Sequence, residues 1–155
     1  MKWSLLPDKL AQLMLTAWVG ALWSIGYLAV PVLFRAQPDR ILAGMLAGEM
    51  FQVVGYLGLI CGGYLLVHQR SFSQHHTTPR AFWLTVCVLL LGALQLFLLQ
   101  PYMAELKHLA APLEVMHSPQ AGEFRMLHGV SSILYLLQSL LGAWLLLIWK
   151  RSPVA

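Results

Sequence analysis

Long uncharged apolar runs, separated by short polar stretches, set the pattern of this chain. A helix needs roughly 20 apolar residues to cross the ~30 Å hydrocarbon layer of a bilayer. The runs lack the alternation of a β-strand, and a backbone in lipid has to satisfy its own hydrogen bonds. We therefore predict an all-α fold, a four-helix transmembrane bundle that forms one domain over residues 1–155, with spans at approximately residues 10–34, 45–67, 81–100 and 126–149.

The composition agrees with a membrane protein. The chain is 59% hydrophobic and 10% charged, whereas soluble domains carry about 25% charged residues. Its net charge of +4 does not indicate nucleic-acid binding, because basic residues are usual at the ends of membrane spans. Both cysteines, Cys61 and Cys87, fall inside predicted spans and suggest neither a disulfide framework nor a metal motif.

Basic residues favour one orientation of the bundle. An even number of spans puts both termini on the same side as the loop between the second and third spans. That side carries Lys2, Lys9, Arg70, Arg80, Lys150 and Arg151, and the opposite side, here called outer, carries Arg35, Arg40, Lys107 and Arg125. Since cytoplasmic loops hold an excess of Lys and Arg, this bias predicts cytoplasmic termini.

Both outer loops are predicted to contain short interfacial helices. Pro38 can start helical turns that lead into the second span. Residues 102–111 place Tyr102 and Leu106 on one face and Glu105 and Lys107 on the other, as in an amphipathic helix at a membrane surface. We expect Pro112 to end that helix.

One face of the second span is predicted to pack closely against its neighbours. Small residues let helix backbones approach each other, which is how helices pack in lipid. The glycines of this span follow steps of four, seven, three and four residues: Gly44, Gly48, Gly55, Gly58 and Gly62. We expect this stripe to face the interior of the bundle.

Polar side chains gather at the outer ends of all four spans, namely Tyr27, Glu49, Gln52, Gln95, Arg125, His128 and Ser131. We predict one shared pocket centred on Glu49, His128 and Ser131, with a Glu49–His128 or Glu49–Arg125 ion pair. Ionisable residues within a span are candidates for function, although a charge near the interface costs little. Two interpretations stay open: a structural staple between helices, or a site for a ligand, proton or ion.

No metal or catalytic motif supports a sharper hypothesis. Glu49 and His128 alone are too few for a zinc site. Methionine and histidine suit copper, and several lie on the outer side without a clustered motif: Met45, Met50, Met103, Met116, Met126, His108, His117 and His128. His68 and His128 are expected at opposite faces of the membrane, so they cannot ligate one haem. We predict no metal, no cofactor and no enzymatic activity, while copper binding stays open.

Three segments carry a resemblance to a known family: residues 18–34 with Trp18, Trp23 and the PVLF motif, residues 43–51, and residues 124–136. They resemble small four-span membrane proteins related to transmembrane protein 205, whose bacterial members form a domain of unknown function. The HGVS motif at residues 128–131 is the most specific part. The resemblance implies a four-helix integral membrane fold and no assigned activity. Our interpretation of the whole chain is a bacterial-type inner-membrane protein. The animal relative's link to drug resistance and secretion points weakly toward transport.

Two functions from different classes follow. The first is a non-enzymatic protein that acts by association with other membrane proteins or with itself, since the chain is small, glycine-rich along one stripe and apolar elsewhere. The second is a small transporter or sensor that binds a proton, metal ion or small ligand at the outer pocket. The expected partners are the lipid bilayer and a second copy or another membrane protein, and no nucleic acid.

The orientation can be tested by cysteine labelling. With cytoplasmic termini, a cysteine placed at Ser73 should resist an impermeant thiol reagent in intact cells, and one at Ser118 should react. The opposite labelling pattern would reverse the predicted orientation.

Overall fold

The computed structural model describes residues 6–71 and 79–149, which form helices and contain no strand. The elements are α1 (Leu6–Trp23), the π-helical η2 (Ser24–Ala29), α2 (Val30–Ala36), α3 (Arg40–Ser71), α4 (Pro79–Leu94), the π-helical η3 (Gln95–Leu99), α5 (Gln100–Ala110), the 3₁₀ turn η4 (Val115–His117) and α6 (Ala121–Ile148). Ser73, chosen above for labelling, lies outside the described residues.

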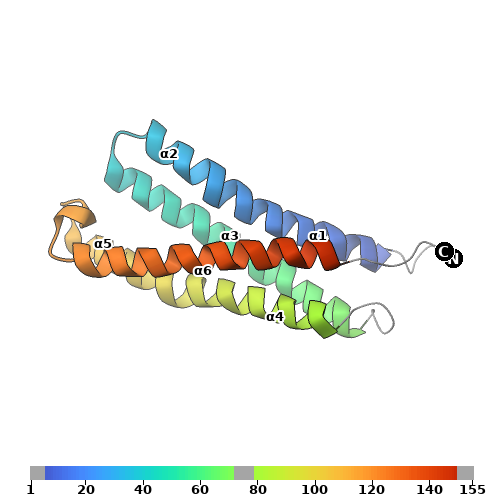
Figure 1. Ribbon diagram of the computed structural model, residues 1–155. Coiled ribbons are helices and arrows are strands. Elements are labelled where there is room, and N and C mark those ends of the chain that lie inside the picture. Colours follow the sequence, from blue (N-terminus) through green and yellow to red (C-terminus); the bar gives the residue numbers. More distant parts are fainter. Residues whose placement is uncertain (1–5, 72–78, 150–155) are drawn as a thin grey trace.

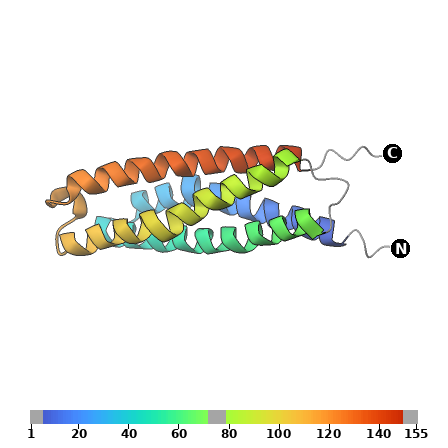
Figure 2. The ribbon, with the colours of Figure 1, turned by 90° about the horizontal axis from the view of Figure 1, so that it is seen from below.

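These elements combine into four rods that run alternately up and down (Figure 1). By length and composition, four helices could cross a membrane: Leu6–Ala36, Arg40–Ser71, Pro79–Ala110 and Ala121–Ile148. Around the bundle, α3 packs against α1 and α4, α4 packs against α6, and α6 closes on α1. Figure 2 shows α4 between α6 and α3. The predicted all-α four-helix fold is confirmed. The first three helices extend beyond their predicted limits at both ends, and the fourth starts five residues earlier than predicted and ends at Ile148.

Packing within the first hairpin follows a simple register centred on Pro38. Trp18 and Gly58 are each 20 residues from Pro38 in the sequence, and they lie in contact. The α3 helix begins just after the turn because Asp39 caps it: its Oδ1 accepts the backbone N–H of Ile41 at 2.9 Å and of Leu42 at 3.1 Å. An antiparallel hairpin thus sets the depth of every residue on both helices.

The centre of the bundle is filled by Trp18, which is 1% exposed. A Cβ atom added at Gly58 would lie 2.5 Å from its Nε1, and one at Gly62 would lie 3.2 Å from its ring. Gly55 faces Leu96 in the same way, with 2.9 Å to its Cδ1, whereas a Cβ atom at Gly44 would make only an ordinary contact of 3.9 Å with Lys107 Nζ. Glycine at positions 55, 58 and 62 therefore lets α3 approach the first and third spans.

Gly48 does not share this role, which corrects the prediction for that position. A Cβ atom there would meet nothing within 4 Å. Gly48 follows Gly44 by four residues, and each step of four rotates about 40° around a helix. That rotation carries Gly48 to the edge of the stripe, beyond the contact with the third span.

Two prolines explain the π-helical segments. The residue before each proline, Val30 or Gln100, donates its backbone N–H five residues back, to Ile25 and to Gln95. Proline has no N–H and crowds the preceding turn, and a wider turn relieves that clash without ending the helix. The helix predicted at residues 102–111 is consequently the continuous extension α5 of the third span rather than a separate element.

The reporter cysteine for this loop should be placed at a residue other than Ser118. Ser118 is only 9% exposed and its Oγ donates to the Val115 carbonyl at 2.7 Å. Met116 is 41% exposed and is the better site for a reporter cysteine.

Replacing Gly58 by alanine should lower the free energy of unfolding by about 1–3 kcal/mol, because the added methyl group forces the indole of Trp18 to move. Gly20→Ala is the matched control, since a Cβ atom at Gly20 meets nothing within 4 Å. Unfolding in mixed detergent micelles measures both. Equal stability of the two variants would contradict the close contact.

Candidate functional site

A buried polar network joins the third and fourth spans. The Nε2 of Gln95 donates to Oε1 of Gln138 at 2.8 Å, and the Ser131 hydroxyl donates to Oε1 of Gln95 at 3.3 Å. Gln138 in turn donates to the Val88 carbonyl at 3.4 Å. Gln95 and Gln138 are 6% and 3% exposed. Their amides are satisfied by each other, so this network holds α4, η3 and α6 together.

A second cluster joins the first and fourth spans. The Tyr27 hydroxyl donates to Oγ of Ser139 at 3.1 Å, and the Trp23 indole donates to the Ser139 carbonyl at 3.4 Å. The Tyr135 hydroxyl donates to the Leu22 carbonyl at 2.7 Å, in the turn before η2. The ring of Tyr135 meets Tyr27 and Phe51 edge-on. These contacts form an aromatic cluster about four turns inside the outer ends, since Tyr135 follows the start of α6 by 14 residues and Trp23 precedes the end of α2 by 13.

Basic groups meet an aromatic ring closer to the outer end. The imidazole of His128 stacks on Phe124 with 5.8 Å between ring centroids and 10° between planes. Lys107 Nζ lies 5.7 Å from the centroid of the same ring and donates to the Gly44 carbonyl at 2.9 Å. Lys107 thereby ties α5 to α3 and α6. Among the described residues, no carboxylate lies within ion-pair distance of its ammonium group.

Three of the predicted pocket residues do not join this site: Glu49, Gln52 and Arg125 are all exposed. The expected ion pair between Glu49 and His128 or Arg125 is wrong, because the ion pairs among the described residues are His68–Asp8 and His117–Glu114. The reason is helical phase. Glu49 precedes Gly58 by nine residues, which is about two and a half turns, so it points away from the core that Gly58 faces.

Of the seven predicted residues, the structure joins Gln95 to Ser131 by a hydrogen bond. Tyr27 of η2 contacts α6 through Ser139, and His128 lies on the side of α6 that faces the first span. Sequence reasoning missed Lys107, Gln138 and Ser139 as members. Gln138 had a visible signal, since it is an amide in the middle of an otherwise apolar run. Lys107 was assigned to a membrane-surface helix and its reach to Gly44 was not visible in the sequence.

An inner-end pair was also missed. His68 Nε2 lies 3.0 Å from Oδ1 of Asp8, and His68 is 4% exposed. Its ring lies 6.2 Å from that of Tyr64 and 6.3 Å from that of Trp149. Both Asp8 and His68 are 30 residues from Pro38, so the hairpin register could have predicted the pair. It fastens the ends of α1, α3 and α6.

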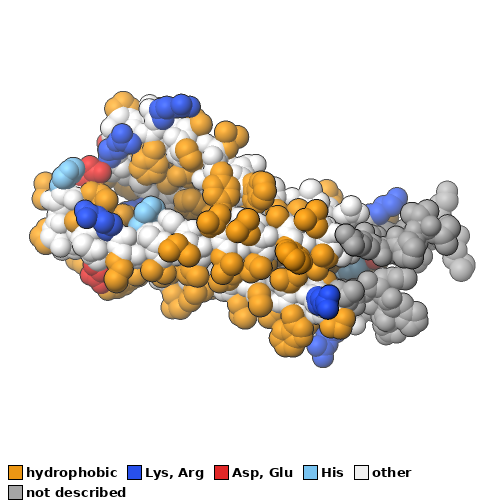
Figure 3. Space-filling model, in the orientation of Figure 1, with side chains coloured by type: hydrophobic (Ala, Val, Ile, Leu, Met, Phe, Trp, Pro, Cys, Tyr) orange, Lys and Arg blue, Asp and Glu red, His pale blue; other side chains and the backbone are white. Residues whose placement is uncertain are grey.

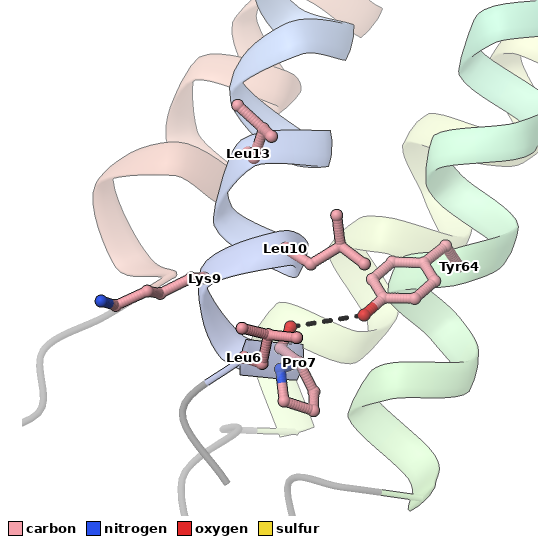
Figure 4. A pocket seen from close by; sticks show the side chains of 6 residues that line it. All are labelled: Leu6, Pro7, Lys9, Leu10, Leu13 and Tyr64. Carbon is pink, nitrogen blue, oxygen red and sulfur yellow. Dashed lines mark hydrogen bonds between the residues drawn. The ribbon is translucent and has the colours of Figure 1, made fainter. Parts of the chain in front are cut away.

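A shallow groove of about 450 Å³ lies beside this pair, between α1 and α3 (Figure 4). Leu6, Leu10 and Leu13 form its apolar wall, and the Tyr64 hydroxyl donates to the Pro7 carbonyl at 3.3 Å. Lys9 points away from Tyr64 (Figure 4). Lys9, the cation among the described lining residues, is thus directed outward, and the tyrosine hydroxyl already has an acceptor.

The described part of the chain brings no three His, Cys, Asp or Glu side chains together as a set that could hold a metal ion. His128, a predicted copper or zinc ligand, stacks on Phe124, and Lys107 lies over the same ring. That environment suits an anion better than a metal cation.

The fold and its surface define the class: an integral membrane protein built as a bundle of four helices. Residues 13–112 match the family described as Domain of unknown function (DUF4149). This match covers well over half of the chain, so the chain belongs to that family. The predicted membership of an uncharacterised domain family is confirmed, while kinship with transmembrane protein 205 stays a prediction.

The family match ends before α6, so the HGVS motif of residues 128–131 lies outside it. Neither a curated protein nor a solved structure matches the chain.

The two buried glutamines allow a double-mutant test. Gln138→Met should destabilise the bundle by about 1–3 kcal/mol, because it leaves the Gln95 amide buried without its partner. Adding Gln95→Met should cost much less than a second independent loss, since both polar groups are then removed. Unfolding free energies of the two single variants and the double variant measure the coupling. Strict additivity would mean that the amides do not depend on each other.

Proposed function

We propose that this protein is non-enzymatic and acts by lateral self-association in the membrane, through the outward face of α3. One observation supports the proposal: Glu49, Gln52 and Tyr56 are all exposed on the side of α3 opposite the core. In a single copy these polar side chains would face lipid. Polar groups in that position are unfavourable and act as attachment points between helices.

The spacing on this face suits a second helix. Glu49, Tyr56 and Gly63 follow one seven-residue step, and Met45, Gln52 and Leu59 follow another, offset by three or four residues. This is the heptad arrangement with which two helices interlock. A Cβ atom at Gly63 would meet nothing within 4 Å, so a neighbouring backbone can approach closely there.

The chemistry of the face favours a second copy of this chain as the occupant. Copies inserted in one orientation present the same face in parallel. The Gln52 amide both donates and accepts, so two of them pair across a two-fold axis. The Glu49 carboxylate accepts from the amide of the other copy, and the Tyr56 hydroxyl supplies a further donor. The set is self-complementary, as an isologous interface requires.

The interior of one copy is filled at the middle of the bundle, which supports association over transport. Leu15, Leu65, Val88 and Leu145 are 0% exposed around Trp18. A solute path through a single copy would have to displace this core. We further propose the bacterial inner membrane as the location, with both termini in the cytoplasm, on the charge bias described above.

Gln52→Leu should weaken self-association, because it removes the central hydrogen bond of the interface. Such a bond contributes roughly 0.6–2 kcal/mol in a membrane, which corresponds to an increase of about 3- to 30-fold in the dissociation constant. Resonance energy transfer between labelled copies in vesicles, measured over a series of protein-to-lipid ratios, gives that constant.

Gln12→Leu is the matched control, since Gln12 is also exposed but lies on the first span. It should leave the dissociation constant unchanged. Wild-type protein that stays monomeric at every ratio would overturn self-association, as would equal effects of the two substitutions. A stable complex with a different protein in place of a second copy would overturn it as well.

A further inference from the structure

The first and fourth spans separate toward the outer end of the bundle. In the described part of the chain, α1 packs against α6, whereas η2 and α2 make no close backbone contact with α6. Figure 1 shows α2 leaning away from α6, with α3 visible between them. The space-filling view shows the surface hollowed there, and charged and histidine side chains gather at that end (Figure 3). The hollow is open on the side surface of the bundle.

Its deep end is an apolar pocket of about 180 Å³ between η2 and α6. The lining consists of Trp23, Tyr27, Leu136, Ser139 and Leu140. The single hydroxyl among the α6 residues already accepts from Tyr27. Hydrocarbon therefore fits this pocket better than a polar solute does.

The outer mouth of the hollow is basic. His128 precedes Tyr135 by seven residues, about two turns, so both lie on the same face of α6. That face points at the first span, because the Tyr135 hydroxyl donates to the Leu22 carbonyl. His128 thus lies above the apolar pocket, and Lys107 rests on the same Phe124 ring as His128 does.

The Lys107 ammonium has capacity for an anion. It has three N–H donors, and one of them is used by the Gly44 carbonyl. No described carboxylate neutralises it. A positive charge at membrane-surface depth and an apolar groove below it together match the two ends of an acidic lipid. From His128 to Leu140 the groove side of α6 extends roughly 18 Å at 1.5 Å per residue.

We propose that this hollow binds an anionic phospholipid of the surrounding bilayer. Its phosphate lies against Lys107 and His128, and one acyl chain runs inward along Trp23, Tyr27 and Leu136. The lipid takes the place that α2 leaves open beside α6. Binding is reversible and involves no covalent step.

Native mass spectrometry of the detergent-purified full chain tests the site with two lipids that differ in headgroup charge, phosphatidylglycerol and phosphatidylcholine. Wild type should bind phosphatidylglycerol more tightly. Lys107→Gln should reduce this preference about fivefold, the contribution of one basic residue near a lipid surface. Lys107→Arg should retain the preference, which separates loss of charge from loss of fold.

Arg125→Gln is the matched control for charge, since Arg125 is exposed on α6 at the same end. It should leave the preference unchanged. An equal loss in Lys107→Gln and Arg125→Gln would show general surface attraction and overturn the site.

The acyl groove has its own pair of variants. Leu136→Trp should fill the pocket and abolish tight binding of phosphatidylglycerol. Leu137→Trp should not, because Leu137 is exposed but does not line the pocket. Unchanged binding in Leu136→Trp would overturn the proposed acyl path. Displacement of the lipid by millimolar inorganic phosphate would instead identify a simple anion site and contradict the proposal.

Discussion

The contact of Trp18 with Gly58 and Gly62 is the constraint on which the rest of the bundle depends. Lipid supplies no hydrophobic drive between helices, so association relies on close packing and interhelical hydrogen bonds. A large ring from α1 fills the space that two glycines leave on α3, and both helices are fixed in register. Once they are fixed, Gly55 receives Leu96 and Gly62 receives Leu89 from the third span. The third span then positions α6 through the Gln95–Gln138 pair.

The same packing explains why the two ends of the bundle differ. At the inner end, His68 pairs with Asp8 and stacks near Trp149, so three helices are held together. Toward the outer end, the described η2 and α2 make no close backbone contact with α6, so the first and fourth spans diverge. The divergence of the first and fourth spans leaves an open hollow beside α6. The exposed polar face of α3 lies on the side of that helix opposite the core. The proposed association and lipid sites therefore use different sides of the molecule.

Much of the arrangement along the membrane axis was accessible from the sequence. The apolar runs predicted the spans, and the turn at Pro38 sets which residues of the first hairpin lie at one level. Gln95 and Ser131 were predicted at one depth and form a hydrogen bond. The prediction that Glu49 lies beside His128 was wrong about the face of the helix on which Glu49 lies, not about its depth along the bundle. Gly58 faces the core, and Glu49 is half a turn away from it.

Length and hydropathy by themselves determined the helical fold, the number of spans and the level of each polar residue, because the thickness of a bilayer and its lack of backbone partners permit little else. The tertiary structure decided which face of each helix points inward. In a soluble protein the apolar face marks the core, but in lipid the outward face is equally apolar, so hydrophobic periodicity carries no such information. The contact of Lys107 with Gly44 depends on which helix faces point inward. The same orientation determines where the proposed lipid site lies.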